Sequence, residues 1–126
     1  MKTTPASLTL AIVRIYRVAL CVKQSEVAKV LNKTTSAWTK VEIGQSQITL
    51  NTLFAVCNFL AIAPNDLMQR VSIGMLQMSQ KGWQFVPELP LEEDDLFKKL
   101  NDYLQDDGRS LFIEDQILDL IKYFCS

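Results

Sequence analysis

Apolar residues in the first 70 positions recur at intervals of three and four, which places their side chains on one face of an α-helix. In the first such segment, Pro5 suits the opening turn, and the pattern continues to Val22. The apolar stripe of this segment consists of Leu8, Ile12, Ile15, Ala19 and Val22. We therefore expect a first helix over about residues 6–22.

Two short helices are expected next, over about residues 24–31 and 35–43. Between them, Asn32 can adopt the left-handed backbone conformation that ends a helix, and Thr34 can cap the start of the following one. Gly44 is expected to end the third helix. The side chains that should anchor this pair in the core are Val27, Ala28, Leu31, Trp38 and Val41.

Two more helices complete the pattern of residues 1–70. A fourth is expected from a Thr49 cap to about Ala61, and a fifth should begin at Pro64, where proline is favoured. The side chains expected to face the core from these helices are Leu50, Leu53, Val56, Cys57, Leu60, Leu67 and Met68. This half is thus predicted to be a five-helix domain.

The pattern changes after Arg70 and predicts a second segment, residues 71–126. Residues 71–86 fit either a β-hairpin, with strands near 75–79 and 83–86, or a helix that continues to about Gln80.

Two amphipathic helices are expected to follow, over about 91–104 and 113–124, with Asp107 and Gly108 ending the first of them. Their apolar positions are Leu96, Phe97, Leu100, Tyr103, Leu104, Ile113, Ile117, Leu118, Leu120, Ile121 and Phe124. The expected fold class is mainly α.

Charge divides the chain at the same point. Residues 1–70 carry eight basic and three acidic side chains, and residues 71–126 carry five basic and eleven acidic ones. The net charge of −1 therefore combines +5 on the first segment with −6 on the second. Such asymmetry between halves is a recognised indication that one half contacts nucleic acid.

The composition argues against enzyme and metal chemistry. Among the 126 residues there is no histidine, which is the usual general base and the commonest metal ligand. The acidic run Glu92–Asp95 has no accompanying nucleophile or glycine-rich phosphate loop, and its acids suit a helix start. We expect no catalytic site, no metal site and no cofactor.

The cysteines and the apolar runs indicate a cytoplasmic protein. Cys21, Cys57 and Cys125 are widely spaced and odd in number, so free buried thiols in a reducing compartment are expected. The most apolar stretch, residues 8–22, contains Arg14 and Arg17 and is too short to span a bilayer. It also lacks the cleavage site of a signal peptide. We expect no membrane association.

Residues 14–68 resemble the phage-repressor and Cro-like helix-turn-helix family, the xenobiotic-response-element type of bacterial transcriptional regulators. Its spacing is matched without insertion from Gln24 to Gly44. The residues that carry the resemblance are Arg17, Gln24, Glu26, Val27, Ala28, Leu31, residues 34–42, Gly44, Thr49, Leu50, Leu53 and Leu60. The resemblance implies a lambda-repressor-like domain that inserts helix 35–43 into the major groove of double-stranded DNA.

The resemblance also assigns roles to individual residues. Thr35, Ser36 and Lys40 match positions that reach base edges, and Gln24 matches one that meets the DNA backbone. Further candidates for phosphate contacts are Thr34, Thr39, Gln45, Lys23 and Lys33. Arg17 and Glu42 match a pair that forms a salt bridge between the first and third helices.

Regulators of this family commonly dimerise, so we expect residues 71–126 to pair two copies of a repressor. The candidate dimer contacts are Leu96, Leu100, Tyr103, Ile117, Ile121 and Phe124. The same stripes could instead form an intramolecular hairpin packed on Trp83 and Phe85. Two other functions stay open. One is an antitoxin whose acidic half binds a toxin, and the other is a protein-interaction module that does not bind DNA.

Overall fold

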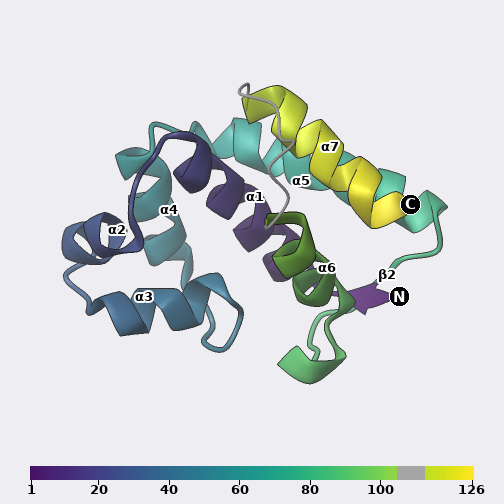
Figure 1. The fold of residues 1–126 in the computed structure, drawn as a ribbon, viewed down its shortest axis with the longest axis horizontal. Helices are drawn as coiled ribbons and strands as arrows, with labels where there is room; N and C mark the ends of the chain where they lie inside the picture. Colours follow the sequence, from purple (N-terminus) through teal and green to yellow (C-terminus); the bar gives the residue numbers. More distant parts are fainter. Residues whose placement is uncertain (105–112) are drawn as a thin grey trace.

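The computed structural model of the chain describes residues 1–104 and 113–126, and this part is mainly helical, as predicted (Figure 1). Its helices are α1 (Pro5–Ala19), α2 (Gln24–Val30), α3 (Thr35–Glu42), α4 (Leu50–Phe59), α5 (Pro64–Gln80), α6 (Asp95–Leu104) and α7 (Ile113–Cys125). The short strands β1 (Lys2–Thr3) and β2 (Gln84–Phe85) form a two-stranded parallel sheet.

Helix α1 lies at the centre of the molecule. It packs against α3, α5, α6 and α7, and Figure 1 shows it passing between the α2–α4 side and the C-terminal helices. All residues from Ser7 to Val13 are buried, together with Ile15. A single apolar stripe was expected from the sequence. The helix is instead buried almost all round, because α6 and α7 cover the side that a 70-residue domain would leave exposed.

Three helices are followed by a residue other than glycine that has a left-handed backbone. Asn32 follows α2 with φ of 55° as predicted, and the amide of Lys33 donates to the carbonyl of Ala28 at 2.9 Å. Cys21 does the same after α1 (φ 58°), and Ala61 does so after α4 (φ 55°). These two residues are not typical helix-ending types, so the sequence does not signal the ends of α1 and α4, which come earlier than the apolar periodicity predicts.

Helix α5 continues without a break to Gln80, so the alternative of a hairpin strand at 75–79 is wrong. Gly74, which weakens the sequence prediction of a helix here, is buried at a helix crossing. A Cβ atom at this position would lie 2.9 Å from Ile121 Cδ1 and 3.2 Å from Leu8 Cδ2. The glycine therefore lets α1 and α7 approach α5 closely.

Strand β2 forms where the second strand of the hairpin was predicted, near residues 83–86. It pairs with β1 at the N-terminus. Lys2 and Thr3 are in register with Gln84 and Phe85, and the amide of Val86 donates to the carbonyl of Thr3 at 2.9 Å. Nothing in the local pattern of residues 1–4 predicts this pairing, because it joins positions more than 80 residues apart.

The boundary that we placed after Arg70 falls inside α5, and both parts of the chain contribute to one hydrophobic cluster. Helix α7 packs on Trp83, whose Nε1 donates to the carbonyl of Phe124 at 2.8 Å. This contact agrees with the alternative in which the last two helices form an intramolecular hairpin packed on Trp83. Helix α6 begins at Asp95 rather than at Leu91, because residues 91–93 form a separate 3-10 turn. Its predicted end at Asp107 and Gly108 lies outside the described residues.

The six candidate dimer contacts are buried within the chain itself. Each exposes 7% or less of its surface, and they pack in the common cluster: Leu96, Leu100, Tyr103, Ile117, Ile121 and Phe124. In this fold they are therefore not exposed for a contact between two copies, and dimerisation through them stays a prediction. Three other residues expected in the core are exposed instead, namely Leu50 (64%), Met68 (43%) and Leu118 (49%).

A buried carboxylate joins the N-terminus to α6. Asp94 exposes 3% of its surface and accepts hydrogen bonds from the hydroxyls of Thr3 (2.8 Å) and Ser7 (2.6 Å). It also accepts from the amide of Leu96 at 3.1 Å, which caps the start of α6. One side chain thus fixes β1, α1 and α6 relative to one another.

The three cysteines are free and differ in accessibility. Cys21 is exposed, whereas Cys57 is 1% exposed and burial raises the pKa of its thiol. At neutral pH a raised pKa lowers the thiolate fraction, so both access and ionisation protect Cys57. Among the described residues, no single helix is long and apolar enough to cross a membrane. Within the described residues, one pair of helices, α1 and α2, reaches that length and hydropathy together, but the pair is bent by 110°.

We expect a thiol reagent such as an aromatic disulfide to modify Cys21 rapidly in the native protein and Cys57 only when the chain unfolds. The reaction can be followed by absorbance, and peptide mapping assigns each phase. The variant Cys21→Ser should lose the fast phase. Modification of Cys57 at the same rate as Cys21 would contradict its burial.

Candidate functional site

The outward face of α3 carries most of the candidate residues. Thr35, Ser36 and Lys40 are exposed there, and Thr39 is half-buried beside them. Thr34 lies at the start of the helix, where its hydroxyl oxygen accepts from the amide of Ala37 at 3.1 Å, as a capping residue should.

The opposite face of α3 is anchored in the core by Trp38, which is 1% exposed, and by Val41, which is 4% exposed. The helix therefore presents a short polar and basic surface from a fixed position.

The remaining candidates surround this face. Lys23 immediately precedes α2, Lys33 lies in the turn between α2 and α3, and Gln45 follows α3; all three are exposed. Gly44 ends α3 with φ of 86°, and the amide of Gln45 donates to the carbonyl of Lys40 at 2.8 Å. This bond holds the segment after α3 close to its last turn.

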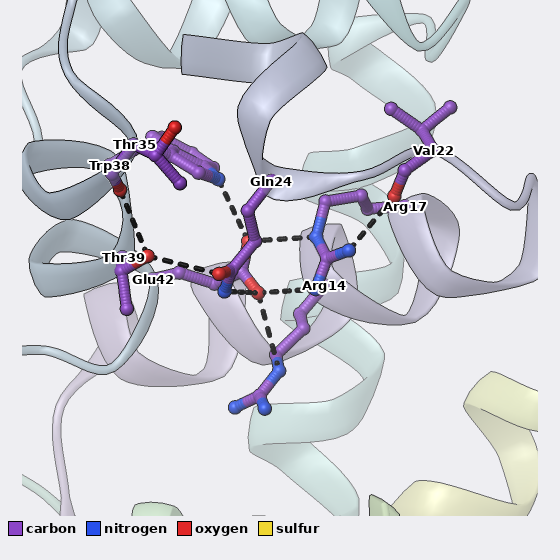
Figure 2. Close-up of polar contacts among 8 residues, drawn as sticks. All are labelled: Arg14, Arg17, Val22, Gln24, Thr35, Trp38, Thr39 and Glu42. Carbon is purple, nitrogen blue, oxygen red and sulfur yellow. Dashed lines mark hydrogen bonds and ion pairs between the residues drawn. The ribbon is translucent and has the colours of Figure 1, made fainter.

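Below this surface, Glu42 is the centre of a buried polar cluster (Figure 2). It exposes 2% of its surface and lies at the end of α3. Arg17 of α1 donates to both of its oxygens, from Nε at 2.9 Å and from Nη2 at 2.7 Å. The ion pair expected from the sequence is thus present in two-pronged geometry, which is the strong form of this contact.

Two neutral side chains also donate to Glu42. The indole Nε1 of Trp38 donates to Oε2 at 2.9 Å, and the amide of Gln24 donates to Oε1 at 3.2 Å. Arg17 also donates from Nη1 to the carbonyl of Val22 at 2.9 Å, just before α2. Through these bonds one carboxylate fixes α3 to both α1 and α2.

Arg14 was not among the candidates, yet it belongs to this cluster. Its Nε lies 3.3 Å from Glu42 Oε1, and only 18% of its side chain is exposed. Burial lowers the pKa of Arg14, while the charge of Glu42 opposes that effect. The sequence did contain a signal, because Arg14 and Arg17 are three residues apart and so share one face of α1.

Gln24 and Thr39, both candidates for DNA backbone contacts, are bonded to each other in the structure. The hydroxyl of Thr39 lies 2.9 Å from Gln24 Oε1 and 2.9 Å from the carbonyl of Thr35, and it can donate to either (Figure 2). The cluster therefore extends from buried Glu42 through Gln24 to the half-buried edge of the α3 surface. These two side chains are positioned, rather than freely mobile.

The surface charge of α2 and α3 follows from this arrangement. Glu42 is buried against two arginines, so it does not contribute an exposed negative charge. The exposed charged side chains of residues 23–45 are Lys23, Lys29, Lys33, Lys40 and Glu26. Four cations against one anion give this surface a net positive charge, in a chain whose total charge is −1.

The described residues bring together no group of three or more Cys, Asp or Glu side chains that could hold a metal ion. Comparisons of the chain with protein-family models, with curated proteins and with solved structures find no match.

Proposed function

We propose that this chain is a sequence-specific DNA-binding transcriptional regulator, a cytoplasmic repressor of the helix-turn-helix type, in which α3 enters the major groove. The observation that carries the proposal is the two-sided construction of α3. Its outward face presents Thr35, Ser36 and Lys40, while its inward face is fixed by Trp38 and Glu42. A helix that reads bases needs both properties, because base contacts depend on a rigidly held backbone.

Each exposed group has a role in this proposal. The Lys40 ammonium can donate to the O6 and N7 atoms of guanine, and the hydroxyls of Thr35 and Ser36 can bond to several base edges. Lys23, Lys33, Thr34 and Gln45 surround α3 and are suited to phosphate contacts, which supply affinity without sequence preference. Gln24 and Thr39 support this surface from its edge through their mutual hydrogen bond.

Repression follows from occupancy of an operator that overlaps a promoter. An operator with two-fold symmetry requires two copies of the protein, with half-sites about one helical turn (~34 Å) apart. Because the six apolar residues of α6 and α7 are buried, a contact between two copies would need another surface.

Separate substitutions of Lys40 and Lys33 should distinguish contacts to base edges from contacts to phosphates. We expect Lys40→Ala to weaken binding to the preferred site by about 1–3 kcal/mol, roughly 5- to 150-fold, and to relax preference at one base position. Lys33→Ala should weaken binding to all sequences alike and reduce the slope of log K against log salt by about 1. Fluorescence anisotropy with labelled duplexes at several salt concentrations measures both effects.

Lys81→Ala is the matched control, because Lys81 is exposed beyond the end of α5 and away from α2 and α3. It should leave affinity and salt slope unchanged. If Lys40→Ala and Ser36→Ala bound every duplex as the unmodified protein does, α3 would not be the part that reads bases.

A further inference from the structure

A cavity of about 700 Å³ lies where the first half of the chain meets the segment before α6. Its walls come from the start of α1, the loop 44–48 after α3, the segment 87–91 and the start of α6. In Figure 1 this place is found between the loop after α3 and the segment that precedes α6. Pockets that bind small molecules have volumes of about 300–1,000 Å³, so the cavity has the size of a small-molecule site.

The charged side chains that line the cavity are acidic. Among the described residues of its lining, Asp94 and Glu88 carry a charge, and no lysine or arginine occurs. Glu88 is exposed, whereas Asp94 exposes only 3% of its surface. A hollow lined by charges of one sign concentrates their field and attracts ions of the opposite sign, so this cavity favours a cation.

Asp94 holds its negative charge without a counter-charge. In the described part of the chain, no lysine or arginine forms an ion pair with it. Its Oδ1 accepts from the hydroxyl of Thr3 and the amide of Leu96, and its Oδ2 accepts from the hydroxyl of Ser7 at 2.6 Å, a length typical of an ionised carboxylate. These bonds fill three of the roughly four acceptor positions of a carboxylate, so Oδ2 can accept one more.

Large apolar side chains make up much of the remaining lining. They come from all the walls of the cavity: Leu10, Ile48, Leu89, Leu91 and Phe97. Such side chains suit the hydrocarbon part of an organic ligand, because covering apolar area is a main source of its affinity. A bare metal ion does not fit, since the described residues bring together no group of three or more Cys, Asp or Glu side chains that could hold one.

From the combined acidic and apolar lining, we propose that this cavity binds a small primary amine with an apolar body. The amine is protonated at neutral pH, and its ammonium group donates to Oδ2 of Asp94, which gains the counter-charge that it lacks. The apolar body lies against the leucines and Phe97. The proposal concerns a small ligand and goes beyond DNA binding.

The cavity also adjoins the end of α3. Gly44, which ends this helix, lines the cavity, and a Cβ atom on it would lie 2.6 Å from Cε2 of Phe97, another lining residue. A bound amine therefore contacts the segment that holds the last turn of α3. If α3 binds DNA as proposed, any change that the amine causes in DNA affinity is matched by an equal change that DNA causes in amine affinity. This last step rests on the proposed function, whereas amine binding does not.

Titration of the full chain without DNA tests the site, so its outcome is separate from that of the proposed function. With 2-phenylethylamine as the probe we expect a dissociation constant of about 1 mM, which is ordinary for a ligand of this size. The shifted amide resonances in NMR spectra should be those of the cavity walls. The matched probes 2-phenylethanol and 3-phenylpropanoate keep the ring and the chain. We expect the alcohol to bind at least roughly tenfold more weakly and the carboxylate not to bind.

Glu88→Gln and Glu93→Gln are a matched pair of variants. They remove the same charge from exposed positions, but only Glu88 lines the cavity. Glu88→Gln should weaken amine binding about two- to fivefold, because an exposed charge contributes modestly, and Glu93→Gln should leave it unchanged. Asp94→Asn should abolish the preference for the amine over the alcohol. Since Asp94 also stabilises the fold, the Glu88 and Glu93 pair decides the question if that variant unfolds.

Four results would each overturn the proposal. They are no binding of the amine at about 10 mM, equal binding of the amine and the alcohol, shifted amides outside the cavity walls, and equal effects of Glu88→Gln and Glu93→Gln.

Discussion

Glu42→Ala is expected to lower the free energy of unfolding by about 3–5 kcal/mol, the cost of removing one partner from a buried ion pair. The substitution leaves Arg14 and Arg17 next to each other without a counter-charge, and both are largely buried. It also removes the acceptor of the Trp38 indole, which is 1% exposed. A domain of this size is stable by about 5–15 kcal/mol, so this loss is a large fraction of its total stability.

Urea unfolding followed by circular dichroism measures the effect. Glu26→Ala is the matched control, because Glu26 is an exposed glutamate of α2 outside the cluster, and it should change stability by no more than about 0.5 kcal/mol. Glu42→Gln keeps the shape and one acceptor oxygen but loses the charge, so its stability should lie between those of Glu42→Ala and the unmodified chain. If Glu42→Ala unfolded within about 1 kcal/mol of the unmodified chain, the cluster would not hold α3 in place.

Asp94→Ala is expected to cost about 2–4 kcal/mol, because it leaves several buried donors without an acceptor and removes a helix cap. The hydroxyls of Thr3 and Ser7 and the amide of Leu96 all donate to this one carboxylate. The loss is partly offset, since the Ser7 hydroxyl can still bond to that of Thr4 at 2.9 Å. The loss of local stability should be largest where β1 and the start of α6 meet.

Amide hydrogen exchange can locate this loss as well as measure it. In Asp94→Ala, the amides of Val86 and Leu96 should lose more protection than those of α3, because the donors described for Asp94 lie in β1, α1 and α6. Glu93→Ala is a suitable control, because Glu93 is exposed one residue away, and it should behave as the unmodified chain. Unchanged protection at Val86 and Leu96 in Asp94→Ala would show that β1 is held by other contacts.

The local signals in the sequence predict the helices of the first half well. Pro5, Thr34, Thr49 and Pro64 each stand at the helix start that their chemistry favours, and Gly44 ends α3 with a positive φ. The Arg17–Glu42 pair and the buried Trp38 were also predictable, because capping, periodicity and the spacing of the resemblance agree there. Where several local rules point the same way, the structure follows them.

The sequence is less informative where distant segments decide the outcome. The pairing of β1 with β2 and the bonds of Asp94 join residues about 80 to 90 positions apart, and no local pattern encodes them. For the same reason, apolar periodicity does not say which partner a stripe will bury against. The stripes of α6 and α7, assigned to a second copy, bury against α1 and α5 of their own chain.

Some apolar residues were assigned to the wrong side of a helix. Leu50, Met68 and Leu118 continue apolar patterns, yet they lie on the outer surface. The apolar stripe of a helix takes up about three to four residues in every two turns. Periodicity therefore leaves the residues at the edges of the stripe ambiguous. In α5, Met68 lies on the exposed side of the helix, although its apolar side chain would fit a core equally well.

The central claim, that α3 reads DNA sequence, is tested most directly by selecting bound duplexes from a random pool with the unmodified chain and with Lys40→Ala. We predict enrichment of a motif with two-fold symmetry, and a loss of preference at one position of each half-site in the variant. Recovery of no enriched sequence, or of the same motif with both proteins, would contradict the account.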